Sequence, residues 1–229
     1  EQGRGWVDNT SNTQDAVVTK ERKKWGRRST ERSMYGTDKA PDPFPLSRTK
    51  LEKFHSCPRC FWIDRVAGMA PPGLPGFLLN TQVDILLKKE FDKHRAAGTP
   101  HPYLPDHGLG HMVPLVHHMM DAWRENFKGV RTSKHDLELF GAVDDIWKSG
   151  EGADEEWFVV DYKSTAINTE ITREMFLEDI YKGGYVRQMA IYQWLLKELG
   201  CPVSTRGFFV YENGNNAADS LLSGGPEDS

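Results

Sequence analysis

The sequence has few cysteines, no long apolar run and no excess of basic residues. Its three cysteines are odd in number and argue against a disulfide framework, so we expect a reducing, cytoplasmic setting. No apolar run approaches the ~18 residues of a membrane-spanning helix, and we expect no membrane partner. The 29 basic and 33 acidic residues give a net charge of −4, so contact with nucleic acid would require local basic patches.

The length and the polarity pattern predict one folded domain between two tails. A chain of 229 residues is long enough to bury a substantial core. Residues 1–44 are polar and lack a sustained apolar period, while residues 213–229 are rich in Gly, Asn and Ser. Such segments are expected to be flexible, which places the domain at residues 45–212. Because the sequence begins with Glu1 rather than methionine, we expect that the native N-terminus is not included.

A basic cluster surrounds Trp25 in the N-terminal tail, between Lys20 and Arg32. Its cations could bind a phosphate backbone while Trp25 stacks on a base. The alternative is a solvated tail, the commoner state of charged segments of low hydrophobicity. The sequence leaves both interpretations open.

Two apolar, β-rich runs predict a β-hairpin that carries acids. Residues 137–147 and 157–162 flank a loop of Ser, Gly, Ala, Asp and Glu. If the strands pair symmetrically about the loop centre, Asp144 lies opposite Asp161, with Cβ atoms roughly 5 Å apart. Lys163 projects to the same face because side chains alternate along a strand.

Two carboxylates this close, on strands this apolar, repel each other unless a positive charge lies between them. Carboxylate oxygens are the ligands that Mg²⁺ or Mn²⁺ prefers, so Asp144 and Asp161 are candidate metal ligands. Lys163 could orient an attacking water or neutralise charge on a phosphate. The alternative is a surface hairpin whose acids are solvated.

Apolar periodicity and turn residues predict several further elements. They are a helix interrupted near Pro58 over 46–67, helices over 80–95, 116–127, 171–180 and 185–199, and a strand over 206–212. In the helix over 185–199, Gln188 and Tyr192 are one turn apart on one face. They could hold a phosphate or a water by hydrogen bonds, with Arg187 adding charge. The alternative for Tyr192 is packing with the leucines that follow it.

Several short motifs, taken together, resemble the RecB-like branch of the PD-(D/E)XK nuclease superfamily. The family patterns are G-x-[I/V]-D, D/E-x-K, Q-x-x-x-Y and the entry segment S-x-x-x-L-x-x-[YF]-x-x-C-P-x-x-[FY]. The matching residues are Gly141 to Asp144, Asp161 to Lys163, Gln188 to Tyr192, and Ser47, Leu51, Phe54, Cys57, Pro58 and Phe61. The resemblance covers roughly residues 46 to 212.

The resemblance implies an α/β fold with a restriction-endonuclease-like core, in which helices flank a mixed central sheet. It also implies a Mg²⁺- or Mn²⁺-dependent nuclease that hydrolyses DNA phosphodiester bonds and leaves a 5′-phosphate. The expected partners are single- or double-stranded DNA and proteins of DNA repair, recombination, phage or CRISPR-type systems. Exonuclease and endonuclease activity remain open, as does the choice between DNA and RNA.

Many members of this branch place a metal-binding histidine in a G-x-x-x-H pattern, from which this chain departs. Asn80 and Asp84 stand at the two positions. A carboxylate is at least as good a ligand for Mg²⁺ as an imidazole, so Asp84 is a third candidate metal ligand. The alternative is that Asp84 is a first-turn residue favoured by the helix dipole.

The cysteines allow two further interpretations. The iron–sulfur cluster of some relatives uses one N-terminal cysteine and three near the C-terminus, but only Cys201 lies downstream here, so we expect no cluster. Cys57 and Cys60 could instead form half of a zinc site or be packed thiols. Two alternatives to an active nuclease therefore stay open: a catalytically degenerate nuclease fold that binds nucleic acid or protein, and a Cys/His zinc module.

Overall fold

The computed structural model describes residues 26–27, 34–71, 78–165, 172 and 183–213. Most of the basic cluster around Trp25, all but one residue of the helix predicted over residues 171–180, and the C-terminal tail beyond residue 213 lie outside these described ranges. No helix within the ranges is long and apolar enough to cross a membrane.

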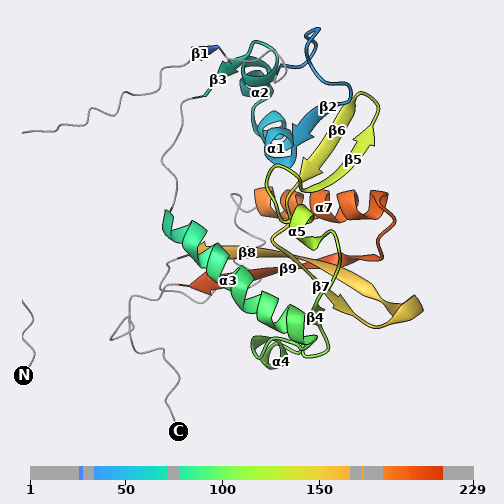
Figure 1. Cartoon of the computed structure of the whole chain (residues 1–229). Helices are drawn as coiled ribbons and strands as arrows, with labels where there is room; N and C mark the ends of the chain where they lie inside the picture. Colours follow the sequence, from blue (N-terminus) through green and yellow to red (C-terminus); the bar gives the residue numbers. More distant parts are fainter. Residues whose placement is uncertain (1–25, 28–33, 72–77, 166–171, 173–182, 214–229) are drawn as a thin grey trace, which may run out of the picture.

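A mixed four-stranded sheet forms the centre of the fold, in the order β4-β7-β8-β9 (Figure 1). β7 (Asp145–Ser149) pairs antiparallel with β8 (Glu156–Thr165), and β8 pairs parallel with β9 (Val203–Asn213). β4 (Val113–Pro114) is a short edge strand beside β7. The sheet is flanked by helices, so the predicted α/β class with a mixed central sheet is confirmed.

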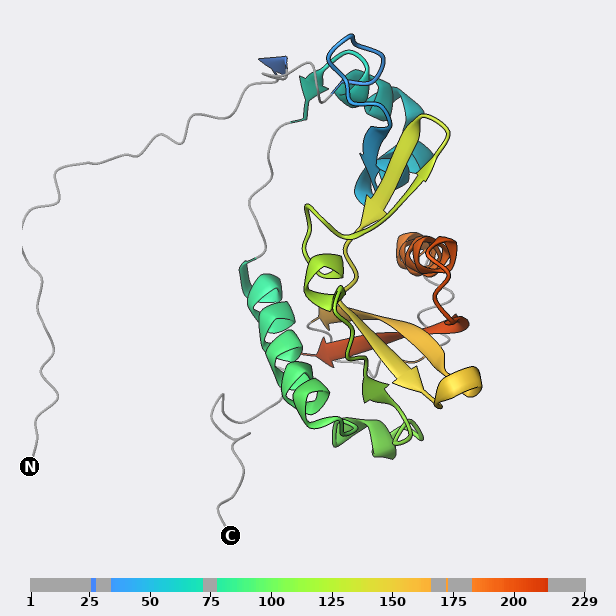
Figure 2. The same ribbon diagram turned by 45° about the vertical axis from the view of Figure 1, so that its right-hand side comes forward.

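Side chains of β8 alternate between two separate cores. Val159 packs in a cluster with residues of α7 (Gly183–Glu198), whereas Val160 packs in a cluster with Phe91 of α3 (Leu78–Ala97). Figures 1 and 2 show these two helices on opposite sides of the sheet. Burial on both faces explains why residues 157–160 of β8 are an uninterrupted apolar run.

A second, three-stranded sheet lies beside α7 and has the order β2-β6-β5. β2 (Phe44–Ser47) runs parallel to β6 (Leu137–Gly141), and β5 (Val130–Lys134) runs antiparallel to it. Two short helices, α1 (Arg48–Ser56) and α2 (Pro58–Arg65), follow β2 directly. The remaining elements are β1 (Gly26–Arg27), β3 (Met69–Ala70), α4 (Tyr103–Asp106), α5 (Met120–Trp123) and the 3-10 helix η2 (Gly152–Asp154).

The predicted hairpin is correct in register and wrong in the extent of its first strand. Asp145 of β7 pairs with Val160 of β8, which is the register expected from the loop centre. The run over 137–147 is not one strand, because β6 and β7 belong to different sheets. The chain breaks at the fully buried Val143, whose N–H donates to the Trp123 carbonyl at 3.1 Å. This bond to the end of α5 replaces strand pairing at the crossing between the sheets.

Two other predicted features differ in the structure. The helix predicted over 116–127 is limited to the four residues of α5. Cys57 and Cys60 are bonded to each other in a disulfide, so the interpretation as packed thiols is wrong. Their Cα atoms lie 5.2 Å apart at the junction of α1 and α2, a normal separation for a disulfide. The pair of thiols that a zinc module requires is therefore not free.

Candidate active site

Three of the predicted site residues meet at a single buried carboxylate. Asp161 of β8 is fully buried on the sheet face that α7 covers, because it lies two residues beyond Val159. Its Oδ1 accepts a hydrogen bond from Gln188 Nε2 at 2.5 Å, and its Oδ2 forms an ion pair with Lys163 Nζ. Strand alternation thus places Lys163, and helix α7 places Gln188, against the same side chain.

The second carboxylate, Asp144, comes from the residue that precedes β7. Its Oδ2 accepts a hydrogen bond from the backbone N–H of Tyr162 at 3.0 Å. Its Oδ1 lies 3.1 Å from Lys88 Nζ of α3. The register of the hairpin therefore brings Asp144 next to Asp161, with one lysine on each acid.

The two carboxylates affect each other electrostatically. Burial, followed by the negative charge of Asp144, raises the pKa of Asp161 to about 6, although Lys163 acts in the opposite direction. A raised pKa means that the charged form of Asp161 is under-compensated at neutral pH. The pair is therefore set up to accept further positive charge.

Tyr192 is both a core residue and a member of the site. Its ring packs in the same cluster as Leu195 and Leu196, and its hydroxyl lies 3.4 Å from Gln188 Nε2. A Cβ on Gly141 would lie only 2.6 Å from Cε1 of Tyr192. The glycine that begins the G-x-V-D motif thus leaves room for the tyrosine ring. The packing of Tyr192 with the leucines is confirmed, and its hydrogen bond to a phosphate or a water stays a prediction.

An arginine that the sequence analysis did not single out reaches the site from α1. Arg48 is hydrogen-bonded to the Tyr192 side chain and opposes the rise in the tyrosine pKa that burial causes. Its Nε is buried and has no hydrogen-bond partner. Arg187 forms two bonds to Glu52 of α1, at 2.6 and 3.1 Å. Its contribution to the charge of the site stays a prediction.

Asp84 lies near the site and shares a lysine with Asp144. Its Oδ2 binds Lys88 Nζ at 2.9 Å, and the same ammonium binds Asp144. Asp84 is the seventh residue of α3, and the first turn of that helix contains no acid. The interpretation of Asp84 as a first-turn residue stabilised by the helix dipole is therefore wrong. Lys88 is a site residue that spacing could have suggested, since it lies one helical turn from Asp84.

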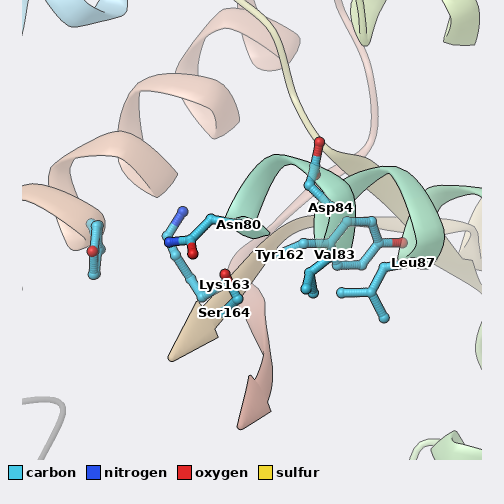
Figure 3. A pocket seen from close by; sticks show the side chains of 8 residues that line it. Asn80, Val83, Asp84, Leu87, Tyr162, Lys163 and Ser164 are labelled. Carbon is cyan, nitrogen blue, oxygen red and sulfur yellow. The ribbon is translucent and has the colours of Figure 1, made fainter. Parts of the chain in front are cut away.

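A pocket of about 210 Å³ opens beside Lys163. Figure 3 shows Asn80 of α3 beside Lys163 and Ser164 of β8, with Asp84 further along the helix. Lys163 Nζ also lies 4.8 Å from the centre of the Tyr185 ring, which is a cation–π contact. The pocket therefore offers polar, cationic and aromatic groups next to the carboxylates.

The donors of the site suit a hard divalent cation. Asp144 and Asp161 supply carboxylate oxygens, and Asp161 Oδ2 is buried without a hydrogen-bond partner beyond its ion pair with Lys163. Among the residues that the structure describes, no three His, Cys, Asp or Glu side chains form a group that could hold a metal by themselves. A cation on the two carboxylates would thus complete its shell with water, as Mg²⁺ commonly does.

Comparison with known proteins gives one match. A family model described as the PD-(D/E)XK nuclease superfamily matches residues 78–218, which is more than half of the chain. The matched range contains α3, both strands of the hairpin and α7, and so includes all six predicted site residues. No curated protein and no solved structure matches.

The neighbouring acids Asp144 and Asp145 should respond differently to removal of charge. Asp145 is fully buried, pairs with Arg95 and accepts a hydrogen bond from the Tyr162 hydroxyl at 2.8 Å. Asp145→Asn should cost about 3–5 kcal/mol in unfolding free energy, since it removes the fully buried partner of Arg95 and leaves that guanidinium only the more exposed Asp92 as an ion-pair partner. Asp144→Asn should cost about 1 kcal/mol or less, because its lysine partner is partly exposed.

Urea unfolding and DNA cleavage, measured on both variants, check this assignment. We expect Asp144→Asn to be stable and inactive. Equal losses of stability would contradict the structural role of Asp145. An active Asp144→Asn beside a folded but inactive Asp145→Asn would show that the wrong acid has been placed in the site.

Gly141 should not tolerate a side chain. Gly141→Ala places a methyl group against Tyr192 and should cost about 1–3 kcal/mol, the usual range for overpacking a filled core. The displaced tyrosine should also slow cleavage. Gly184→Ala is the control, because its nearest neighbour would be 3.5 Å away and alanine favours a helix. Chemical unfolding of both variants is the measurement, and equal stability of the two would contradict the packing argument.

Proposed function

The chain belongs to the PD-(D/E)XK nuclease superfamily, and from this premise we propose that it is a Mg²⁺- or Mn²⁺-dependent nuclease that hydrolyses phosphodiester bonds in DNA. The observation that carries the proposal is the meeting of Asp144, Asp161 and Lys163 at one end of the hairpin. Asp144 and Asp161 would hold the cation. When bound, it would supply Lewis acidity that polarises a phosphoryl oxygen and activates water.

Lys163 would act on the charge that develops during cleavage. Its ammonium is held between the Asp161 carboxylate and the face of Tyr185, and 18% of its side-chain surface is exposed. A phosphate entering the neighbouring pocket can therefore reach it. There it would stabilise negative charge on the phosphate as the bond to the leaving oxygen breaks.

Gln188, Tyr192 and Arg48 would position the reacting groups. Gln188 holds Asp161 by its amide N–H, which restricts the orientation of the carboxylate. Arg48 has a buried N–H group without a partner and a planar fork of donors suited to a phosphate. We assign it to a phosphate of the bound strand, next to Tyr192.

We assign the chain to the RecB-like branch of the superfamily. The support is the glycine at Gly141, the glutamine–tyrosine pair of α7 and the entry segment that forms α1 and α2. In the structure, α1 lies against α7 through the Glu52–Arg187 bonds, so the entry segment adjoins the site. Single- or double-stranded DNA is the proposed substrate, and proteins of DNA repair, recombination, phage or CRISPR-type systems are the proposed partners.

A catalytically degenerate fold that binds nucleic acid or protein is the second candidate. It is favoured by the two lysines: Lys88 pairs with Asp144 and Lys163 pairs with Asp161. Each central acid therefore already has a cation of the chain itself beside it, where a metal would otherwise bind. The two candidates differ in whether DNA is cleaved or only bound.

The purified protein is expected to cleave linear DNA only in the presence of Mg²⁺ or Mn²⁺, because its central donors are carboxylates that suit such ions. Excess EDTA should reduce cleavage to the background rate, and added Mn²⁺ should restore it. Gel analysis of end-labelled single- and double-stranded DNA is the measurement. Full activity in EDTA would contradict the proposal, and binding without cleavage at any metal concentration would favour the degenerate fold.

Lys163→Ala is expected to slow cleavage by about 10²-fold or more, the scale seen when one electrostatic group is removed from a transition state. Its affinity for Mn²⁺ should change little, since the lysine is not a ligand, and DNA binding should persist because many basic contacts share it. Asp161→Ala should lose metal and cleavage together. Lys148→Ala, which removes a lysine of β7 paired with Glu155, is the control and should cleave at the unmodified rate.

Single-turnover rates and calorimetric Mn²⁺ titrations separate these outcomes. Should Lys163→Ala cleave as fast as the unmodified chain, the lysine has a structural role only. In that case the binding module gains support.

A further inference from the structure

Lys88 is placed between two acids that come from different parts of the chain. Its Nζ lies 2.9 Å from Asp84 Oδ2 and 3.1 Å from Asp144 Oδ1, both normal lengths for charge-assisted hydrogen bonds. Asp84 is one turn away on α3, whereas Asp144 lies across the gap to the hairpin. Only 21% of the Lys88 side-chain surface is exposed, so this arrangement is partly shielded from water.

The ammonium of Lys88 stands where two carboxylates would otherwise bind a metal from both sides. An ammonium donates three hydrogen bonds and accepts none, so it can bridge both acids in place of a cation. A divalent ion cannot share that position, because like charges at contact distance repel strongly in a poorly hydrated site. Lys88 and a metal therefore exclude each other between Asp84 and Asp144.

Asp144 has further capacity on its other side. Oδ2 receives a hydrogen bond from the Tyr162 backbone, and a carboxylate oxygen has two lone-pair positions. This oxygen faces β8, which is the strand that carries Asp161. A cation shared by Asp144 and Asp161 is therefore compatible with Lys88 remaining on Oδ1.

We propose that Lys88 is a built-in cation that takes the place of a second divalent ion, so that the site binds one metal, on Asp144 and Asp161. Asp84 then acts by positioning Lys88 rather than by coordinating the metal. This inference rests on the proposed metal dependence. It also explains the departure from the family histidine, because Asp84, which stands at that position on α3, holds a lysine rather than a metal.

Calorimetric titration of the full chain with Mn²⁺ tests the inference without relying on cleavage. The unmodified chain should bind one equivalent. Lys88→Met should bind two, because Asp84 and Asp144 are then free to share an ion. Asp84→Asn/Lys88→Met should return to one equivalent. Asp84→Asn alone should also bind one, with a dissociation constant within about threefold of the original, because the charge that it removes is already paired with Lys88 and lies at a distance from the ion.

Lys89→Met is the matched control, because Lys89 is the exposed neighbour on the same helix, and it should behave like the unmodified chain. Lys88→Arg keeps the charge and should stay at one equivalent, whereas Lys88→Gln should bind two. If Lys88→Met does not fold, the comparison of these two variants tests the inference in its place. Thermal melting monitors folding of each variant.

Two stoichiometries would overturn this inference without touching the proposed function. They are two equivalents on the unmodified chain, and one equivalent with unchanged affinity on Lys88→Met and Lys88→Gln. A large loss of affinity in Asp84→Asn would also overturn it, because Asp84 would then be a ligand. Absence of Mn²⁺ binding in every protein, including the unmodified chain, would instead refute the metal-dependent function on which the inference depends.

Discussion

The arrangement of this molecule depends on two carboxylates held side by side where a sheet is covered on both faces. Charge in such a place is costly unless it is compensated. The compensation comes from three directions: Lys163 on the same strand, Lys88 on α3, and the Gln188 amide on α7. Both covering helices are thus attached to the hairpin by polar bonds as well as by their apolar cores. The relative placement of α3, α7 and the hairpin is therefore part of the site.

The parts of the site that depend on local spacing could be predicted from the sequence. The loop centre determined the register, and the register put Asp144, rather than the adjacent Asp145, beside Asp161. Alternation along a strand put Lys163 on the same face. Helical spacing placed Gln188 and Tyr192 together, and in the structure Gln188 Nε2 lies 3.4 Å from the Tyr192 hydroxyl. Each of these relations spans only a few residues or one symmetric turn.

The parts that depend on how distant elements cross could not be predicted. Lys88 reaches Asp144 because of the angle at which α3 passes the hairpin, and Arg187 turns to Glu52 because α1 packs beside it. The break at Val143 has the same origin: an uninterrupted β-rich run does not reveal that its two halves pair in different sheets. Periodicity indicates which face of an element is buried, but it does not indicate which other element packs against that face.

The boundary of the matched family segment and the boundary of the folded unit do not coincide. The family match begins at residue 78, yet β2 lies earlier and pairs with Leu137 to Phe140 of β6. A rearrangement that joined the matched segment to another N-terminal sequence would leave β6 as an open edge, with unpaired backbone groups prone to association with other chains. It would also separate Arg48 from Tyr192. The segment before the match and the nuclease core can therefore be exchanged between proteins only as a single piece.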